Sequence, residues 1–279
     1  MSEDLYFYTY RKCYFPLDTT RIDEAEYLLL GVPFDSTQTG MTGARYGPSS
    51  IRMASFDLEH YDPEEDLDLS EIRLHDIGDV DCVPGSPVET FNRIRHTMEN
   101  IPPQKKLISL GGEHSISLPI IDMLRPQMVI SFDAHPDLRN DYMGVGLSHS
   151  SVMRRVNERG IPLEIIGARE GSKEEFDYAK GNGIGVVPPQ LIDDYKGPSD
   201  KDIYISIDLD VFDRLEVGNP VPGGIDFNTF CKITKELIRK NSIRGFDIVE
   251  LSSQPNEYSS YFAAKLLFKM ISYLESYKD

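Results

Sequence analysis

The sequence of 279 residues is poor in cysteine and in positive charge, and it has no long hydrophobic run. Its three cysteines, Cys13, Cys82 and Cys231, are scattered and odd in number, which excludes a disulfide framework and a cysteine zinc site and indicates reduced, structural residues. No apolar run approaches the roughly 18–20 residues that a membrane span needs. The N-terminus also lacks a basic stretch followed by an apolar one. We therefore expect an unprocessed cytoplasmic protein with no membrane contact.

Lysine and arginine number 29 against 46 aspartate and glutamate residues, which gives a net charge of −17. This excess disfavours nucleic acid and anionic lipid as partners and favours a metal ion or a cationic small molecule. Hydrophobic residues make up 40% of the chain, enough for a folded core. Because no linker or internal repeat divides the chain, we expect a single domain over residues 1–279. The acidic segment Tyr61–Glu71 is most simply a solvated loop.

Apolar runs of strand length alternate with segments of helical period, a pattern typical of β–α units. The expected strands are Glu26–Pro33, Arg73–Ile77, Lys106–Leu110, Met128–Phe132, Leu163–Gly167, Gly185–Val187, Asp202–Ile207 and Gly245–Leu251. The expected helices are Ser49–Phe56, Val88–Glu99, Ser117–Leu124, Ser150–Glu158, Glu174–Ala179, Asn228–Lys240 and Ser259–Tyr277. Several strands are apolar throughout, as when both faces of a sheet are covered. The sequence thus predicts an α/β fold of three layers (αβα) with a mostly parallel sheet of about eight strands.

Two segments place metal-ligand side chains after expected strands, where the functional groups of a parallel sheet belong. His114 follows two glycines that allow a sharp turn, although a single histidine of this kind is more often structural. Asp133, His135 and Asp137 alternate after another strand and therefore point the same way. Buried polar groups are unfavourable without a partner. A divalent cation is the simplest partner, and a hydrogen-bonded polar cluster is the alternative.

A third segment ends the expected strand Asp202–Ile207 with two further carboxylates, Asp208 and Asp210. Two like charges this close repel each other unless a cation lies between them. The three segments together offer two imidazoles and four carboxylates, a set that suits two ions of Mn²⁺ or a related metal better than a structural zinc. Two adjacent metals normally share a water whose pKa they lower, so hydrolysis is the expected reaction class.

These motifs resemble the ureohydrolase family, which contains the arginases and agmatinases. The resemblance rests on the segments Gly31–Ser36, Thr42–Arg52, Gly111–Ser115, Ser131–Asp137 and Ser206–Asp210, in family order. It implies an arginase-like fold, two Mn²⁺ per subunit and a homo-oligomer, either trimer or hexamer. One ion would be held by His114, Asp133, Asp137 and Asp208, and the other by His135 and Asp210 with Asp133 and Asp208 bridging. A bridging hydroxide would attack the guanidinium carbon of the substrate, giving urea and an amine.

The resemblance adds two residues outside the metal ligands. His149 stands near where family members place a histidine that shuttles protons to the leaving amine. A surface histidine at a helix start is the alternative, because Ser150 follows where the family usually has glycine. Glu250 matches the carboxylate that binds the guanidinium through two hydrogen bonds. The candidate catalytic residues are therefore His149, Glu250 and Asp137, and the first two are also candidate substrate ligands.

Two departures from the family pattern bear on the substrate. The segment Val211–Gly224 differs from the agmatinase turn, with Val221 where glutamate is common and Arg214 in place of proline, which leaves recognition of the substrate tail open. The arginase pattern for an α-carboxylate is missing from Leu138–Gly146. The resemblance therefore favours a small cationic guanidino substrate, agmatine, hydrolysed to putrescine and urea in polyamine biosynthesis. The alternatives are 4-guanidinobutyrate, aminopropylagmatine or arginine as substrate, and a non-catalytic metal-binding homologue.

Overall fold

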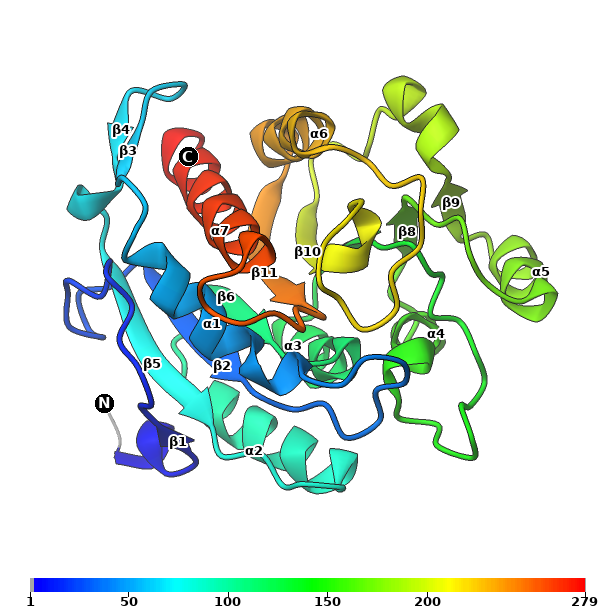
Figure 1. Cartoon of the computed structure of the whole chain (residues 1–279), viewed down its shortest axis with the longest axis horizontal. Helices are drawn as coiled ribbons and strands as arrows, with labels where there is room; N and C mark the ends of the chain where they lie inside the picture. The colour runs from blue at the N-terminus through cyan, green and yellow to red at the C-terminus, as the bar shows by residue number, and fades with distance from the viewer. Residues whose placement is uncertain (1–2, 279) are drawn as a thin grey trace.

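A sheet of nine strands forms the centre of the protein in the computed structural model, which describes residues 3–278 (Figure 1). The strand order is β1-β5-β2-β6-β11-β10-β7-β8-β9. The strands are β1 (Thr9–Tyr10), β2 (Tyr27–Val32), β5 (Leu74–Val80), β6 (Lys106–Gly111), β7 (Met128–Phe132), β8 (Leu163–Ile166), β9 (Gly185–Val187), β10 (Asp202–Asp208) and β11 (Ser242–Val249). Strand β1 runs antiparallel to β5, and the other pairs are parallel. The predicted parallel sheet of about eight strands is confirmed.

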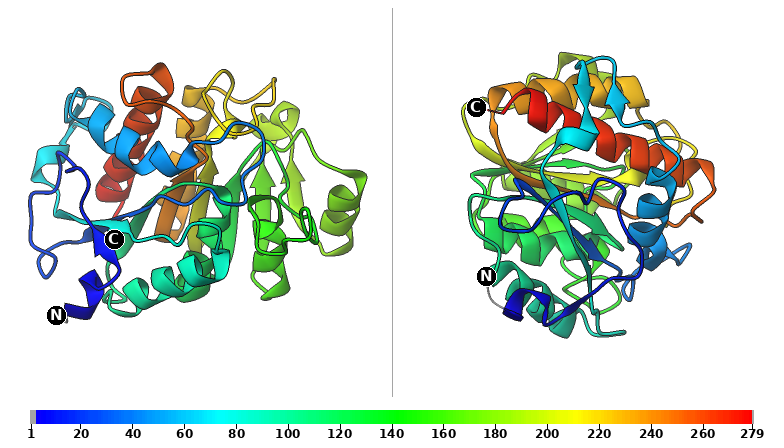
Figure 2. Two further views of the ribbon diagram at one scale, coloured as in Figure 1. Left: turned by 60° about the horizontal axis from the view of Figure 1, so that its bottom comes forward. Right: turned by 90° about the vertical axis from the view of Figure 1, so that its left-hand side faces the viewer.

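Helices cover both faces of the sheet, which confirms the predicted three-layer architecture (Figure 2). One face carries α1 (Gly47–Ser55), α6 (Phe227–Lys240) and α7 (Tyr258–Ser276), and the other carries α2 (Pro87–Glu99), α3 (Ser117–Leu124) and α4 (Val152–Glu158), with α5 (Lys173–Gly181) beside β9. Each face has its own apolar core. Within β2, Leu28 and Leu30 pack into one core, whereas Tyr27 and Leu29 pack into the other. This alternation requires both faces of a strand to be apolar.

The acidic segment Tyr61–Glu71 is mostly exposed, as expected, but it is folded as a hairpin against the helices and is not a simple loop. It contains the hairpin strands β3 (Tyr61–Asp62) and β4 (Leu67–Asp68) and the 3-10 helix Leu69–Glu71. Lys269 of α7 donates to Asp62 at 2.9 Å and to Glu64 at 2.6 Å, and Lys235 of α6 donates to Glu64 at 2.8 Å. The two lysines lie 171 and 207 residues away from these partners in the sequence, so local patterns did not reveal the ion pairs.

Further 3-10 helices occur at the ends of regular elements: Glu3–Tyr6, Ala44–Tyr46, His114–Ile116, His149–Ser151, Pro189–Asp194 and Leu209–Val211. Three of them begin at or beside candidate site residues, because the chain turns sharply where the central strands end. The three cysteines are free, as predicted. Within residues 3–278, no helix combines the length and the apolar character that crossing a membrane requires.

Candidate active site

The candidate metal ligands lie where four neighbouring strands in the middle of the sheet end. Strands β6, β11, β10 and β7 are adjacent, and a candidate residue stands at or just after the carboxyl end of each. His114 follows β6, Asp133–Asp137 follow β7, Asp208 ends β10 with Asp210 two residues later, and Glu250 follows β11. The carboxyl ends of parallel strands are the usual place for a binding site in an open α/β sheet. The topology therefore brings together residues that are far apart in the sequence.

His114 faces three carboxylates from one side of its ring. Its Nδ1 atom lies 3.1 Å from Oδ2 of Asp133 and 3.1 Å from Oδ2 of Asp137. Oδ2 of Asp208 is 3.4 Å from the same nitrogen. All four side chains are buried, and within the described part of the chain neither His114 Nδ1 nor Asp133 Oδ2 has a hydrogen-bond partner. Buried polar atoms without partners are unfavourable, and a cation among these atoms would satisfy them. The donor set thus fits a metal ion.

A second group of ligand atoms shares Asp133 with the first. His135 Nδ1 lies 2.7 Å from Oδ2 of Asp210 and 3.7 Å from Oδ1 of Asp133. The other oxygen of Asp210 accepts a hydrogen bond from the backbone N–H of Ala134 at 2.9 Å. The structure therefore brings all six predicted ligands together in two adjoining groups. That Asp208 bridges two ions stays a prediction.

Burial and mutual repulsion shift the pKa values of these ligands. Burial and the neighbouring charge of Asp137 raise the pKa of Asp133 to about 8. Burial and Asp210 raise the pKa of Asp208 well above its usual range. Burial opposes protonation of His135, but its contact with Asp210 outweighs this effect and raises the pKa to about 10. The ligands consequently hold protons at neutral pH that a divalent cation would displace.

Residues of β10 and β11 orient the His114 ring from behind. Its Nε2 atom lies 2.9 Å from Oγ of Ser206, and the Ser206 hydroxyl donates to Oδ1 of Asp247 at 2.7 Å. Because that hydroxyl proton goes to Asp247, the serine oxygen must accept from His114 Nε2–H, which leaves Nδ1 free to bind a cation. The motifs in the sequence did not indicate this role of Ser206 and Asp247. Ser206 stands two residues before Asp208, so strand alternation could have placed the two side chains on one face.

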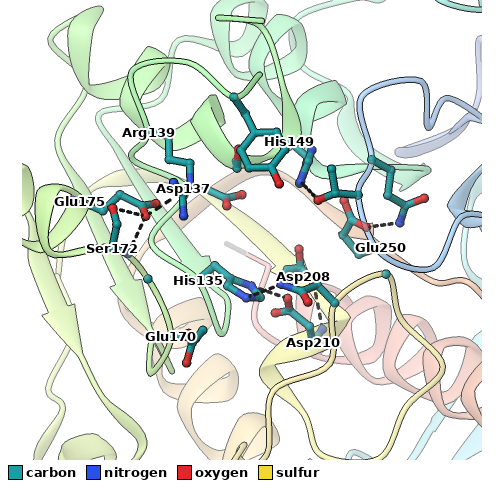
Figure 3. Close-up of a pocket in the computed structure, with 17 residues that line it drawn as sticks. His135, Asp137, Arg139, His149, Glu170, Ser172, Glu175, Asp208, Asp210 and Glu250 are labelled. Atoms are coloured by element: carbon teal, nitrogen blue, oxygen red, sulfur yellow. Dashed lines mark hydrogen bonds and ion pairs between the residues drawn. The ribbon is translucent and has the colours of Figure 1, made fainter. Parts of the chain in front are cut away.

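Glu250 forms one wall of the pocket beside the ligands (Figure 3). Its Oε1 atom accepts from the backbone N–H of His114 at 2.8 Å, and Oε2 accepts from Nε2 of Gln38 at 2.7 Å. Burial raises its pKa to about 8 although the hydrogen bond from His114 acts in the other direction. The backbone of Glu250 has a φ of 69°, and that of Asp137 a φ of 53°. Non-glycine residues in this left-handed region are uncommon and concentrate at functional sites.

His149 lines the same pocket and is half-buried rather than exposed. Its Nε2 atom lies 3.2 Å from Oγ1 of Thr39, and its Nδ1 atom lies 3.5 Å from Oγ1 of Thr37. Its backbone N–H donates to Thr37 Oγ1 at 3.1 Å. Burial lowers the pKa of His149, so the ring is neutral near pH 7. A neutral imidazole that reaches a pocket can take up and give back a proton there.

Glu113 is a buried carboxyl group that was not among the predicted site residues. It accepts from the backbone N–H of Thr37 at 2.6 Å and from the Thr37 hydroxyl at 2.5 Å, and the Ser115 hydroxyl also donates to it. Burial raises its pKa to about 7. Through Thr37 this carboxyl group fixes the loop that contacts His149. Its place directly before His114, in a motif already singled out, was the available signal.

The pocket is a cavity of about 280 Å³ that runs alongside the ligands. Glu250 and His149 line one part of it, and Arg139, Glu170 and Glu175 line the part on the other side of Asp137 and His135 (Figure 3). Nε of Arg139 lies 3.6 Å from Oε2 of Glu175. The wall is thus rich in carboxylates, and this side of the cavity suits a cationic group more than an anionic one.

The segment Val211–Gly224 borders the pocket, but through residues other than the two that depart from the family pattern. Gly218 and Asn219 line the cavity, whereas Val221 and Arg214 are not among its lining residues. The Asn219 amide nitrogen lies 3.0 Å from Nε2 of His135. The departures at 214 and 221 therefore do not reach the pocket directly.

Known proteins share both the sequence and the fold over nearly the whole chain. The sequence profile of the arginase family matches residues 25–272. The N(1)-aminopropylagmatine ureohydrolase of Thermococcus kodakarensis is 40% identical, with 96% of this chain and 97% of that protein covered. An agmatinase of Pyrococcus horikoshii is 38% identical, with 95% and 97% covered. The crystal structure of agmatine ureohydrolase of Thermoplasma volcanium has a TM-score of 0.84 at 30% identity, with 94% of each chain covered.

Proposed function

Because the chain belongs to the arginase family and is a hydrolase of the ureohydrolase type, we propose that it cleaves agmatine to putrescine and urea. The observation that carries the proposal is a single cavity lined by the Glu250 carboxylate and by four of the candidate ligands, His135, Asp137, Asp208 and Asp210. A planar guanidinium pairs with a carboxylate through two hydrogen bonds, and the ligand groups lie next to it. The names of the similar proteins favour agmatine or its aminopropyl derivative.

The proposed cofactor is a pair of Mn²⁺ ions. His114, Asp133, Asp137 and Asp208 would hold one, and His135 and Asp210 the other, with Asp133 and Asp208 shared. The unpartnered, buried Nδ1 of His114 and Oδ2 of Asp133 support a cation at this place. Nitrogen and oxygen ligands without thiolate suit Mn²⁺. Two divalent ions, when bound, supply the positive charge that lets water give up a proton near neutral pH.

Glu250 and His149 would then divide the remaining work. Glu250 holds the guanidinium, since both of its oxygens are fixed by hydrogen bonds and keep lone pairs to accept from the substrate. Addition of water to the guanidinium carbon and cleavage of the bond to the tail nitrogen yields urea, and the departing nitrogen needs a proton. His149, neutral near pH 7 and facing the pocket, would receive a proton at a ring nitrogen and pass it to that amine.

The acidic pocket wall favours a cationic tail over an anionic one. Glu170 and Glu175 line the cavity away from Glu250 and would attract the ammonium of agmatine or of aminopropylagmatine. Arginine and 4-guanidinobutyrate bring a carboxylate to the same wall. Apart from histidines, Arg139 is the only cationic residue that lines the cavity in the described part of the chain. Its guanidinium group already lies near the Glu175 carboxylate.

Urea release by the Mn²⁺-loaded protein from agmatine, aminopropylagmatine, 4-guanidinobutyrate and arginine tests the proposal. We expect kcat/KM to be highest for a substrate with a cationic tail, because contacts to a polar tail can discriminate by orders of magnitude. Preference for arginine or 4-guanidinobutyrate would refute the assignment of a cationic tail. Bound metal without urea from any of the four would favour a non-catalytic homologue. The Glu250→Gln variant is the matched control: it should keep its metal and lose most turnover.

A further inference from the structure

We infer that Gln38 is a positioning residue, which holds the Glu250 carboxylate in the orientation that receives the guanidinium, and that Gly218 supplies the space this contact needs. The inference rests on the proposed function in assigning the guanidinium to Glu250. It concerns a residue outside every motif that pointed to the metal ligands. It also gives the segment Val211–Gly224 a role at the guanidinium end of the pocket rather than at the substrate tail.

Two donors from different parts of the chain fix the two oxygens of Glu250. The backbone N–H of His114 reaches Oε1 at 2.8 Å, and the Gln38 side chain reaches Oε2 at 2.7 Å. With one oxygen held, a carboxylate can still turn about its last carbon–carbon bond. With both held, its plane is set before the substrate arrives, and the lone pairs that remain face a defined direction. Gln38 therefore determines how Glu250 is presented.

The second polar atom of the Gln38 amide supports this assignment. Its Oε1 atom is buried and, within residues 3–278, has no hydrogen-bond partner. When Glu250 is ionised, as it must be to hold a guanidinium, it only accepts hydrogen bonds, so the amide turns its NH₂ group toward Glu250, as in the structure. Rotating the amide would place oxygen against oxygen. The contact with Glu250 thus decides the orientation of Gln38, even though its own acceptor is left unsatisfied.

Gly218 lies against both members of this pair. A Cβ atom at position 218 would stand 2.4 Å from Gln38 Nε2 and 3.0 Å from Glu250 Oε2. The obstruction on the Gln38 side is the far end of a flexible side chain, so an alanine at 218 would push the amide away from Glu250. The backbones of the two loops also meet here, since Gly218 O accepts from the N–H of Met41 at 2.9 Å. Two independent substitutions can therefore break the same contact.

The first test replaces Gln38 by leucine, which has a similar size but no donor. We expect the KM for agmatine to rise about tenfold or more, since a hydrogen bond to a charged group is lost, with a smaller change in kcat. Inhibition by free guanidinium ion should weaken by the same factor. Inhibition by putrescine, which has no guanidinium group, should stay unchanged. A general loosening of the pocket would weaken both inhibitors, and that result would overturn the inference.

The second test uses Gly218→Ala and the double variant Q38L/G218A. If both single changes break one contact, Gly218→Ala should reproduce the effect of Gln38→Leu, and the double variant should be no worse than either. Fully additive effects would contradict the inference. Ser36→Ala is the control in the same loop, because Ser36 Oγ accepts from Gly85 N–H at 2.9 Å and neither residue lines the cavity. Its kinetics should match those of the unchanged protein.

The failure of this inference can be told apart from failure of the proposed function. If the unchanged protein releases no urea from any guanidino substrate, the function is wrong and the role of Gln38 in it falls as well. If the unchanged protein turns over agmatine but Gln38→Leu leaves KM and guanidinium inhibition unaltered, only the inference is wrong. Melting temperature and Mn²⁺ content, measured for each variant, should equal those of the unchanged protein, and a change in either would indicate a structural role instead.

Discussion

Loading the protein with Mn²⁺ should release protons, because the metal-free ligand groups hold them at neutral pH. The pKa of His135 is about 10, and contact with three carboxylates outweighs burial and raises that of His114 well above its usual range. Each imidazole must lose its proton before its Nδ1 atom can bind a cation.

These pKa values set the size of the effect. Release of two protons makes the product of the two metal dissociation constants fall about 100-fold for each unit rise in pH, which corresponds to roughly 2.7 kcal/mol in total. Isothermal titration calorimetry of MnCl₂ binding to the metal-free protein at pH 7.0 counts the released protons directly, when the binding heats in two buffers with different ionisation enthalpies are compared. The His135→Asn variant should release about one proton fewer. Release of fewer than one proton by the unchanged protein would refute the account of the ligand groups.

Three further predictions concern stability and the residues around the site. Burial raises the pKa of Asp133 and of Glu250 to about 8, so between about pH 4 and pH 8 the folded metal-free protein binds more protons than the unfolded chain. Its stability should therefore fall as pH rises, by about 1.4 kcal/mol per pH unit for each proton. A melting temperature that rises from pH 5.5 to 8 would contradict this prediction. The Asn219 amide lies beside Nε2 of His135, and with its oxygen turned to that atom it accepts from Nε2–H while Nδ1 binds the ion. Asn219→Ala should therefore weaken Mn²⁺ binding about 10- to 100-fold. Electron paramagnetic resonance of free Mn²⁺ measures the change, and unaltered affinity would exclude an orienting role. Buried Arg52 contacts the carboxylates of Asp76 at 2.8 Å and Asp79 at 2.5 Å. Arg52→Met leaves both buried aspartates without this partner and should lower the free energy of unfolding by about 3–5 kcal/mol. A loss under 1 kcal/mol in urea unfolding would show that these ion pairs contribute little.

The fold and the metal ligands could be predicted because their signals are local. A strand that is apolar throughout indicates a sheet covered on both faces, and alternation after it places Asp133, His135 and Asp137 on one side. Boundaries were less certain. Strand β11 starts at Ser242 rather than Gly245, because Ser242 and Ile243 pair with Asp202 and Ile203 of the neighbouring strand. That pairing depends on register, which no short segment contains.

The residues that support the ligands could not be predicted, because their roles arise only when distant segments meet. Gln38 contacts Glu250 across 212 residues, and Ser206 contacts His114 across 92. Neither residue type indicates a site by itself. The ion pairs of the acidic hairpin were missed for the same reason, since the lysines that pair with it belong to α6 and α7. Glu113 differs, because it stood within a motif, and only its buried contacts reveal that it fixes Thr37.

The most direct test of the central claim is urea release from agmatine by the Mn²⁺-loaded protein, with arginine as the comparison substrate. We expect Mn²⁺-dependent formation of urea and putrescine in equal amounts, with kcat/KM for agmatine about 100-fold or more above that for arginine. Failure to release urea from agmatine, or a preference for arginine under the same conditions, would contradict it.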